Sequence, residues 1–366
     1  MLLYTTTHGF VTRVGQSGQT VDTGGVSVVL SPLTAGVTLA GSIARETYSE
    51  FVPFQLDRSS RTLERRYTNG DSAFLDLGDV QMHYRDEGPR DAPVVVALHG
   101  SCSSLHTWDG WAERLSDRFR VVRLDMPGFG LTGPRESRHT LEGLIESVGA
   151  LCDELGLEEV AVAGNSLGGG IAWRLAVERP DLVERLVLVD AGGATLLSHI
   201  ARHYRTLGVE FLTRYATPRM AVRMLLRDAY GDTAKVTENL VTRYYDLLLH
   251  SGNRRAVMDL ASNYREDHFP PERPVPGTDR VALPSTYDPS PSVLDGYDIA
   301  DVSVPTLFQW GSEDTWLPES FGRDLAAHVP DSQFVTYEGV GHVPMEESPE
   351  STATDVAAFL PRNHSS

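Results

Sequence analysis

The sequence predicts an α/β protein with a mostly parallel central sheet, helices on both faces of that sheet, and a helical insertion. Two observations predict this class. Short apolar runs alternate with segments of helical periodicity before residue 194 and again after residue 300. Nearly continuous apolar runs are typical of parallel strands that are buried on both faces. The residues between these two parts show no clear strand pattern, so we expect one sheet that the insertion interrupts.

The expected strands begin with a hairpin. Ala73–Leu77 and Val80–Asp86 flank the turn Gly78-Asp79, and a tight turn of this kind joins antiparallel strands. We therefore expect an antiparallel edge on the sheet. The strands that follow are expected at Pro93–Leu98, Arg120–Asp125, Val160–Ala163, Leu186–Val189, Val304–Trp310 and Gln333–Tyr337.

The expected helices carry apolar residues three and four positions apart, as Leu141, Leu144, Ile145 and Val148 do. Thr140 precedes this stripe and is expected to cap its helix. Around the strands, helices are expected at 108–115, 140–155, 167–178, 319–328 and 349–360. In the insertion, they are expected at 196–216, 218–230, 233–251 and 253–264, followed by a proline-rich connector over 265–291.

These patterns predict three parts in the chain. Residues 71–193 and 301–366 are expected to form the α/β core, and 194–300 the inserted helical part with its connector. Residues 1–70 are expected to be an N-terminal arm of uncertain structure, irregular and weakly β over most of its length. Within this arm, Thr23–Ala44 is uncharged and long enough to span a bilayer, but Pro32 and four glycines make it a poor membrane helix. A cytoplasmic protein is the preferred interpretation, and an anchored or exported form stays open.

Charge and cysteine content narrow the classes of function. The formal net charge of −18 repels phosphate backbones, so nucleic acid is not expected as a partner. Two cysteines, Cys102 and Cys152, do not make a disulfide framework, and two reduced thiols are expected. His199 and His203 lie four apart, but two ligands alone make a poor metal site, so no metal is expected.

The strongest chemical signal is the segment Gly164-Asn165-Ser166-Leu167-Gly168. It is a G-x-S-x-G motif that follows an apolar strand and opens a helix. The two glycines leave room for a sharp turn, which would lift the Ser166 hydroxyl above the sheet at the N-terminus of a helix. Ser166 is therefore the candidate nucleophile, and a glycine-rich turn with a capping serine is the alternative.

A second motif, His99-Gly100-Ser101-Cys102, follows the strand that ends at Leu98. A hydrolytic serine needs two backbone N–H donors for its oxyanion. We assign them to Leu167, directly after the nucleophile, and to Ser101, with Cys102 as the alternative to Ser101. His99 is interpreted as a brace for this loop. Cys102 as nucleophile is disfavoured because no general base is placed for it.

The nucleophile needs a histidine base that a carboxylate holds in place. Two later loops at the C-terminal ends of strands supply candidates, with Asp314 orienting His342 and His342 accepting the proton of Ser166. Glu313 and Asp190, which also follow strands, stay open as alternative acids.

Six segments in this order resemble the α/β-hydrolase fold superfamily: HGSCSSLHTW, RLDMPGFGLTGP, AGNSLGGGIAW, ERLVLVDAGG, PTLFQWGSEDTWLP and GVGHVPMEESPE. The chain is most similar to the capped serine esterases and carbon–carbon hydrolases of that superfamily, over residues 75–361 apart from 194–300. The resemblance implies the α/β-hydrolase fold, Ser166, Asp314 and His342 as a catalytic triad, and the amides of Ser101 and Leu167 as an oxyanion hole. It also implies that residues 194–300 form a helical cap.

Departures from subfamily patterns favour an esterase that acts on a small-molecule ester and needs no cofactor. Similar epoxide hydrolases and haloalkane dehalogenases carry an aspartate at the position of Ser166. Ring-cleavage-product hydrolases, the main alternative, carry an HG-x-G-P-G loop that HGSCSS replaces here. A perhydrolase or haloperoxidase side activity would use the same triad, and a ligand-binding module without activity is the alternative from another class. Leu105, Trp316 and Val343 flank the expected catalytic loops and predict a pocket for apolar or aromatic esters, or else plain core packing. The sequence leaves the oligomeric state open.

Overall fold

The computed structural model describes residues 19–22, 27–30, 57–192, 217–268, 293–294 and 297–360. The chain divides into two compact units, Met1–Val52 and Pro53–Ser366. In the first, β1 (Gln19–Asp22) pairs with β2 (Ser27–Leu30) in antiparallel orientation. The second unit contains all the residues discussed below.

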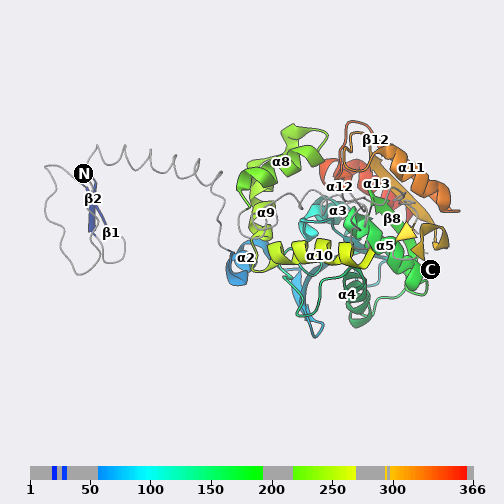
Figure 1. The fold of residues 1–366 in the computed structure, drawn as a ribbon, viewed down its shortest axis with the longest axis horizontal. Coiled ribbons are helices and arrows are strands. Elements are labelled where there is room, and N and C mark those ends of the chain that lie inside the picture. The colour runs from blue at the N-terminus through cyan, green and yellow to red at the C-terminus, as the bar shows by residue number, and fades with distance from the viewer. Residues whose placement is uncertain are drawn as a thin grey trace, which may run out of the picture. The chain divides into compact units, whose positions relative to one another are not determined.

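In the described part of the second unit, eight strands form one sheet in the order β12-β11-β8-β7-β5-β6-β4-β3 (Figure 1). The hairpin strands β3 and β4 are antiparallel, β4 is antiparallel to β6, and the other neighbours are parallel. The predicted mostly parallel sheet with an antiparallel edge is therefore confirmed. The strands are β3 (Ser72–Asp76), β4 (Gln81–Glu87), β5 (Val94–Leu98), β6 (Arg120–Leu124), β7 (Val160–Asn165), β8 (Val183–Val189), β11 (Thr306–Gly311) and β12 (Ser332–Tyr337).

Helices cover both faces of this sheet because its strands are apolar on both sides. Along β5, Val96 and Leu98 enter one buried cluster with α4, α5 and α11, whereas Val95 and Ala97 enter a second cluster with α3 and α13. Thr140 caps α4 as predicted, since its Oγ1 accepts a hydrogen bond of 3.1 Å from Gly143 N. The helices are α3 (Asp109–Leu115), α4 (Leu141–Glu154), α5 (Leu167–Glu178), α11 (Glu319–His328), α12 (Pro344–Glu347) and α13 (Pro349–Phe359).

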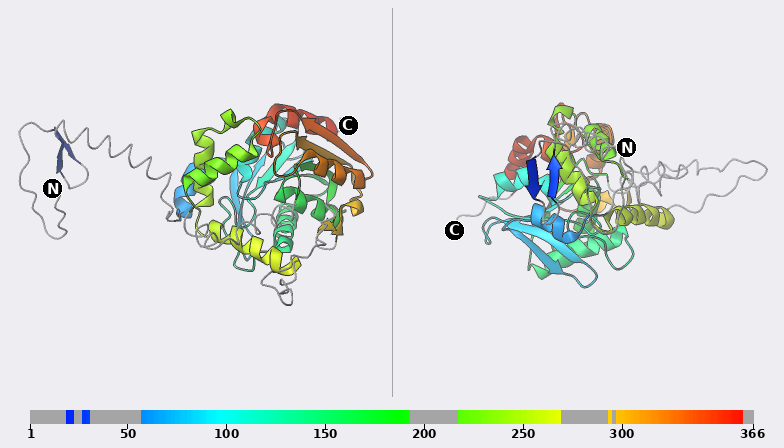
Figure 2. Two further views of the ribbon diagram at one scale, coloured as in Figure 1. Left: turned by 45° about the horizontal axis from the view of Figure 1, so that its top comes forward. Right: turned by 90° about the vertical axis from the view of Figure 1, so that its left-hand side faces the viewer.

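The insertion contributes three described helices, α8 (Arg219–Ala229), α9 (Glu238–Leu248) and α10 (Asn253–His268). In the left view of Figure 2, α8 and α9 lie at the left of the core and α10 runs along its lower edge. The predicted continuous helix over 233–251 is wrong, because a short 3₁₀ turn at Thr233–Lys235 precedes α9. Thr237 begins the new helix by accepting a hydrogen bond from Leu240 N at 3.2 Å, which favours a start rather than a continuation there. The helix expected at 196–216 and residues 269–291 of the expected connector lie outside the described residues. The expectation that the connector begins at 265 is wrong, because α10 continues to His268.

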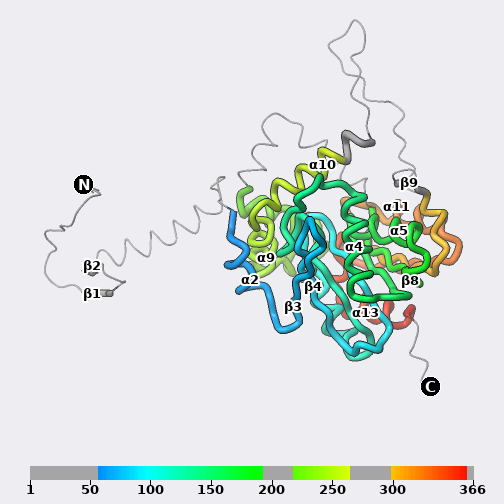
Figure 3. The backbone as a smooth tube through the Cα atoms, turned by 90° about the horizontal axis from the view of Figure 1, so that it is seen from below, coloured from blue at the N-terminus to red at the C-terminus, as the bar shows by residue number. Residues whose placement is uncertain are grey.

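One helix was not predicted. α2 (Ser60–Tyr67) lies where the sequence analysis expected irregular or weakly β structure, and it packs beside α9 (Figure 3). Leu63 is its one fully buried apolar residue, so it carries too little periodicity to be recognised. Its partner is instead a buried carboxylate of α9, because Asp246 accepts hydrogen bonds of 2.8 Å from both Arg66 and Tyr67.

No helix among the described residues is both long enough and apolar enough to cross a membrane. Most of Thr23–Ala44, the stretch examined for this in the sequence, falls outside the described ranges.

Candidate active site

The turn between β7 and α5 holds Ser166 in a strained conformation. Its φ of 54° and ψ of −116° lie where side chains other than glycine are rarely found, and the residue is 1% exposed. The flanking glycines make the turn sterically feasible. A Cβ on Gly164 would lie 2.2 Å from the Gly168 carbonyl oxygen, and a Cβ on Gly168 would lie 2.4 Å from that of Leu98. The motif therefore folds as the sequence predicts, with the serine at the first turn of α5.

The loop after β5 approaches this turn from the neighbouring strand. A Cβ on Gly100 would lie 2.8 Å from Asn165 Oδ1 and 3.1 Å from Ser166 Cβ, so glycine is required for the close approach. The loop reverses at Cys102, whose φ is 59°, and Ser103 N donates a hydrogen bond to Gly100 O at 3.3 Å. Ser101 thus lies in a tight turn, directly after the glycine that approaches Ser166. Leu167 begins α5 on the other side of Ser166 and is fully buried.

The surroundings of His99 and Cys102 indicate structural rather than catalytic roles. The His99 ring joins two loops, because Nε2 accepts a hydrogen bond from Met126 N at 3.0 Å and Nδ1 lies 2.7 Å from Gly100 O. Burial lowers the pKa of His99, so the neutral ring that this bonding needs is favoured. Burial also raises the pKa of the Cys102 thiol to about 11, which leaves little reactive thiolate at neutral pH.

His342 follows β12 and its side chain is held by the loop after β11. Asp314 Oδ2 lies 2.7 Å from His342 Nδ1, and the side chains are 0% and 3% exposed respectively. Asn165, next to Ser166, fixes the same loop by donating from Nδ2 to the carbonyl oxygens of His342 at 3.0 Å and Val189 at 3.1 Å. The structure therefore brings together segments that are about 150 to 180 residues apart in the chain.

The pairing leaves two reactive atoms available. Ser166 Oγ and His342 Nε2 are both buried, and neither has a hydrogen-bond partner in the described part of the chain. Because Asp314 accepts the proton on Nδ1, the neutral imidazole carries its lone pair on Nε2. A histidine in this tautomer can accept a proton from an alcohol.

Burial and charge act on Asp314 in opposite directions. Burial would raise its pKa, but the neighbouring His342 and hydrogen bonds, among them that from Leu317 N, outweigh burial and hold the pKa below its ordinary value. The carboxylate is also fixed in direction, since Oδ1 accepts hydrogen bonds from Trp316 N at 2.8 Å and Leu317 N at 3.0 Å. Asp314 is thus an ionised, rigidly held partner of His342.

The two alternative acids lie in different places. Glu313 is exposed, and its backbone N donates to Val340 O at 2.9 Å. Asp190 is fully buried and adjoins Asp314 rather than replacing it. Of the three candidates, Asp314 is the one whose carboxylate contacts the imidazole at hydrogen-bond distance.

The insertion holds the His342 loop, which the sequence analysis did not foresee. His342 N donates to Ala229 O at the end of α8 at 2.7 Å, and Trp316 Nε1 donates to Asp228 Oδ2 at 2.6 Å. The carboxylate of Glu347 accepts backbone hydrogen bonds from Gly231 and Gly341, at 3.0 and 2.9 Å. Local sequence carries no signal for such contacts between distant loops.

The predicted pocket residues have different environments. The Trp316 ring lies against the His342 ring, with centroids 4.7 Å apart at 46°. Val343 is 8% exposed and packs in the cluster with Trp316. Leu105 is 0% exposed, and its backbone N donates to Asp125 Oδ1 at 2.7 Å. Trp316 is thus the pocket candidate that contacts the proposed base.

Glu346, four residues after His342, links the loop after β5 to the insertion. Its carboxylate accepts hydrogen bonds from Tyr244 on α9, at 2.7 Å, and from Arg243. Ser103 Oγ in turn donates to the Tyr244 hydroxyl at 3.2 Å. Arg243 and Glu346 also line a cavity of about 720 Å³ with Tyr230 and Met345. A polar network therefore borders both candidate loops.

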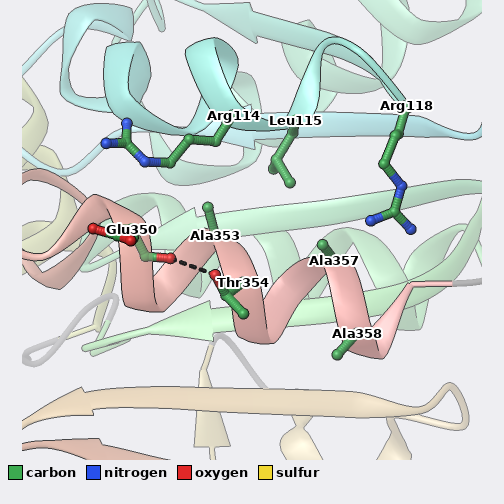
Figure 4. Close-up of a pocket in the computed structure, with 8 residues that line it drawn as sticks. All are labelled: Arg114, Leu115, Arg118, Glu350, Ala353, Thr354, Ala357 and Ala358. Carbon is green, nitrogen blue, oxygen red and sulfur yellow. Dashed lines mark hydrogen bonds between the residues drawn. The ribbon is translucent and has the colours of Figure 1, made fainter.

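Neither the hollow between α3 and α13 nor the group of potential metal ligands points to a different active site. A hollow between α3 and α13, lined by Arg114, Arg118 and Glu350 among others, contains none of the candidate residues (Figure 4). The one group of potential metal ligands found among the described residues is Asp190, Asp314 and His342, whose ligand atoms lie within 4.8 Å of one another. His199 and His203 fall outside the described ranges.

Comparison with known proteins agrees with the fold. The family model of the alpha/beta hydrolase fold matches residues 93–349. A 2-hydroxy-6-oxononadienedioate/2-hydroxy-6-oxononatrienedioate hydrolase from Pseudomonas putida is 30% identical over 293 residues, which are 77% of this chain and 92% of that protein.

Two solved structures are similar in fold. The enol-lactonase from Burkholderia xenovorans LB400 has a TM-score of 0.59 at 21% identity, covering 78% of this chain and 99% of that one. A thermophilic esterase from Thermogutta terrifontis has a TM-score of 0.58 at 21% identity, covering 79% and 97%.

Proposed function

The chain belongs to the α/β-hydrolase fold family, and on that premise we propose that this hydrolase is a serine carboxylesterase. Ser166 is the proposed nucleophile, His342 the general base and Asp314 the residue that orients the base. The amides of Ser101 and Leu167 are the proposed oxyanion donors. The substrates proposed are small to medium apolar or aromatic esters.

One observation carries this proposal. A strained serine at the start of α5 lies next to Asn165, whose side chain bonds the backbone of a histidine already paired with a buried aspartate. Backbone strain of this kind is retained where the surrounding structure enforces it, and it clusters at functional sites. A capping serine would need no such partners.

The reaction proposed is acyl transfer to water. His342 Nε2 takes the proton from Ser166 Oγ as the oxygen attacks the ester carbonyl, and the carbonyl oxygen becomes an oxyanion. Two backbone amides would hold that oxyanion, each contributing about 3 kcal/mol. The imidazolium then returns the proton to the leaving alcohol. Water repeats the same steps on the acyl-enzyme and releases the acid and free Ser166.

We further propose that the insertion acts as a cap over the site. Contacts from its described helices to the catalytic loops support this, above all His342 N to Ala229 O and Trp316 Nε1 to Asp228. The Trp316 ring beside His342 supports an apolar or aromatic substrate group at that position.

A carbon–carbon hydrolase that uses the same three side chains is the second candidate. The Pseudomonas putida relative, named for cleaving a dienedioate, favours it at 30% identity. Such a substrate carries carboxylates, which require cationic or hydrogen-bonding partners. Arg243, the arginine in the network beside the loop after β5, is already paired with Glu346 and Asp109, which favours the uncharged ester.

A substrate comparison tests the proposal. Purified protein is assayed with p-nitrophenyl acetate and butyrate and with a dienoate ring-cleavage product, each beside Ser166→Ala. We expect ester turnover that Ser166→Ala abolishes, and a lower kcat/KM for the dienoate. Ser101→Ala is the matched control, because a backbone donor survives loss of the side chain.

A higher kcat/KM for the dienoate would instead assign the carbon–carbon reaction. No turnover of either class, with ligand binding unchanged in Ser166→Ala, would support a binding module. Peracid formation with added peroxide would add a perhydrolase side activity to the same acyl-enzyme.

A further inference from the structure

Asp190 occupies a strained position at the end of β8. Its φ of 41° lies in the left-handed region, which aspartate and asparagine tolerate better than most residues. Its backbone N donates to Gln309 O at 3.0 Å, and its Oδ1 accepts a hydrogen bond from Gly311 N at 3.1 Å. The carboxyl is therefore anchored between β8 and β11, and it is 0% exposed.

The same carboxyl faces the proposed catalytic pair. Its oxygen lies within 4.8 Å of both an Asp314 oxygen and a His342 nitrogen. The other titratable groups that act on it electrostatically are Glu347 and Tyr337. Asp190 thus faces two carboxylates, one phenol and one imidazole, and a second full negative charge beside Asp314 would be strongly unfavourable.

We propose that Asp190 is a neutral carboxylic acid at neutral pH and donates its proton in a hydrogen bond to Asp314. In this arrangement Asp190 is a positioning residue, because it acts on His342 only through Asp314. The inference rests on the proposed function for its catalytic meaning. Its structural content, a protonated carboxyl beside a buried carboxylate, rests on the burial of Asp190, its approach to Asp314 within 4.8 Å and its unpaired Oδ2.

The directions in which the pKa values of Asp190 and Asp314 are shifted agree with this proposal. Burial, followed by the charge of the neighbouring Asp314, raises the pKa of Asp190 well above its ordinary value. Burial would raise the pKa of Asp314, but the charge of His342 and the hydrogen bond with it outweigh burial and lower it. Two interacting carboxyls commonly separate in this way, so that one holds the proton and the other the charge.

The remaining oxygen of Asp190 has one role open to it. Oδ2 is buried and, among the described residues, has no partner that could donate a hydrogen bond to it. A proton on this oxygen and a contact with Asp314 would remove the cost of burying an unpaired charge.

A neutral donor beside Asp314 has a predictable effect on the base. It draws electron density from the Asp314 carboxylate and weakens that carboxylate's hold on a protonated imidazole. Removing this donor should therefore strengthen the interaction of Asp314 with the protonated ring, and the variants below test that effect.

Two substitutions separate this idea from its alternatives. Asp190→Asn keeps a neutral side chain that can donate to Asp314 and tolerates the left-handed backbone. Asp190→Gly keeps the backbone freedom but removes the donor. Glu313→Gln is the matched control, because Glu313 is an exposed acid directly beside Asp314 in the chain.

The experiment is an NMR titration of the His342 ring in the full-length protein and these variants, with the acid limb of kcat/KM measured in parallel. We expect the midpoint to stay within about 0.3 pH units in Asp190→Asn and Glu313→Gln, and to rise by about one unit in Asp190→Gly. A midpoint that falls in Asp190→Asn would show that the native residue is ionised and overturn the proposal. An unchanged midpoint in Asp190→Gly would overturn the positioning role.

A second measurement covers the case in which Asp190→Gly does not fold. Infrared spectra at neutral pH should show a protonated carboxyl band in the native protein that disappears in Asp190→Asn. Absence of such a band in the native protein would contradict the proposal. Neither spectroscopic method needs turnover, so inactive native protein would overturn the proposed function and leave this test standing.

Discussion

Two histidine–aspartate pairs in this molecule have the same geometry and different surroundings. His83 Nδ1 lies 2.7 Å from Asp125 Oδ2, and His342 Nδ1 lies 2.7 Å from Asp314 Oδ2. All four side chains are at most 3% exposed. Each aspartate also accepts two backbone hydrogen bonds, Asp125 from Leu105 and Leu131 and Asp314 from Trp316 and Leu317.

What differs is the environment of each imidazole. The His83 ring, on β4, packs against the Phe74 ring with centroids 4.9 Å apart. His342 lies in a loop that Asn165 ties to the strained Ser166. A buried histidine–aspartate pair is therefore no sign of catalysis by itself. We assign the first pair to holding loops in place and the second to chemistry.

The largest expected difference between the pairs is in activity. Ser166→Ala and His342→Ala should each lower kcat by at least about a thousandfold, because serine and base act as one unit. His83→Ala should lower it less than about tenfold in folded protein. Esterase assays on proteins of matched circular dichroism measure this. A double variant of Ser166 and His342 much worse than either single one would contradict a shared mechanism.

The two aspartates should differ in what their substitution affects. Loss of Asp125 should mainly lower stability, and loss of Asp314 should mainly lower kcat. Asp125→Asn should lower the free energy of unfolding by about 3 kcal/mol, because it weakens the acceptor of three buried donors. Asp314→Asn should lower kcat by about a thousandfold or more, since the imidazole loses its orienting partner. Urea unfolding and kinetics on both variants test this. Equal kinetic losses in the two folded variants would remove the distinction.

The pH dependence of stability should also distinguish the sites. Burial would raise the pKa of Asp125, but the hydrogen bond and charge of His83 dominate and lower it. Asp125 therefore stabilises the fold above the unfolded value of about 3.9, and this stability is lost as the pH falls. Asp190, with its raised pKa, contributes stability at low pH that is lost as the pH rises.

Unfolding free energies between pH 3 and 8 check these signs. In Asp125→Asn, the unfolding free energy should depend less on pH at the acid end of this range. In Asp190→Asn, it should depend less on pH above about pH 4. Parallel curves for the native protein and both variants would contradict the assignments.

The smallest expected effect concerns the link between the insertion and the loop after β5. Tyr244→Phe removes the hydroxyl that joins Ser103 to Glu346, and kcat should fall about threefold to tenfold with little change in KM. Tyr245→Phe is the control, because its hydroxyl bonds Thr217 O instead. Equal losses in both variants would indicate a general effect on α9.

The sheet and the turn at Ser166 could be predicted from the sequence because their signals are local. The apolar run of β5 and the glycines around Ser166 follow from strand burial and a close backbone approach. α2 and the break before α9 were missed. The first depends on Asp246, far along the chain, and the second on a capping threonine within a continuous helical pattern.

For the site, the sequence identified side chains but not the contacts between them. Asp314 and His342 are predicted as candidates from their places after strands, and the structure adds their 2.7 Å contact. Asp190 was considered only as a replacement for Asp314, because chain order cannot show that two carboxyls adjoin. The His83–Asp125 pair and the backbone bond from His342 to Ala229 have no local signal.

Covalent labelling tests the central claim most directly. Protein treated with diethyl p-nitrophenyl phosphate is digested and analysed by mass spectrometry. We expect a single phosphoryl adduct on Ser166, formed at the native rate in His83→Ala, strongly slowed in His342→Ala and absent in Ser166→Ala. Inactivation with the adduct on another residue, or labelling of Ser166 at the native rate without His342, would contradict the account.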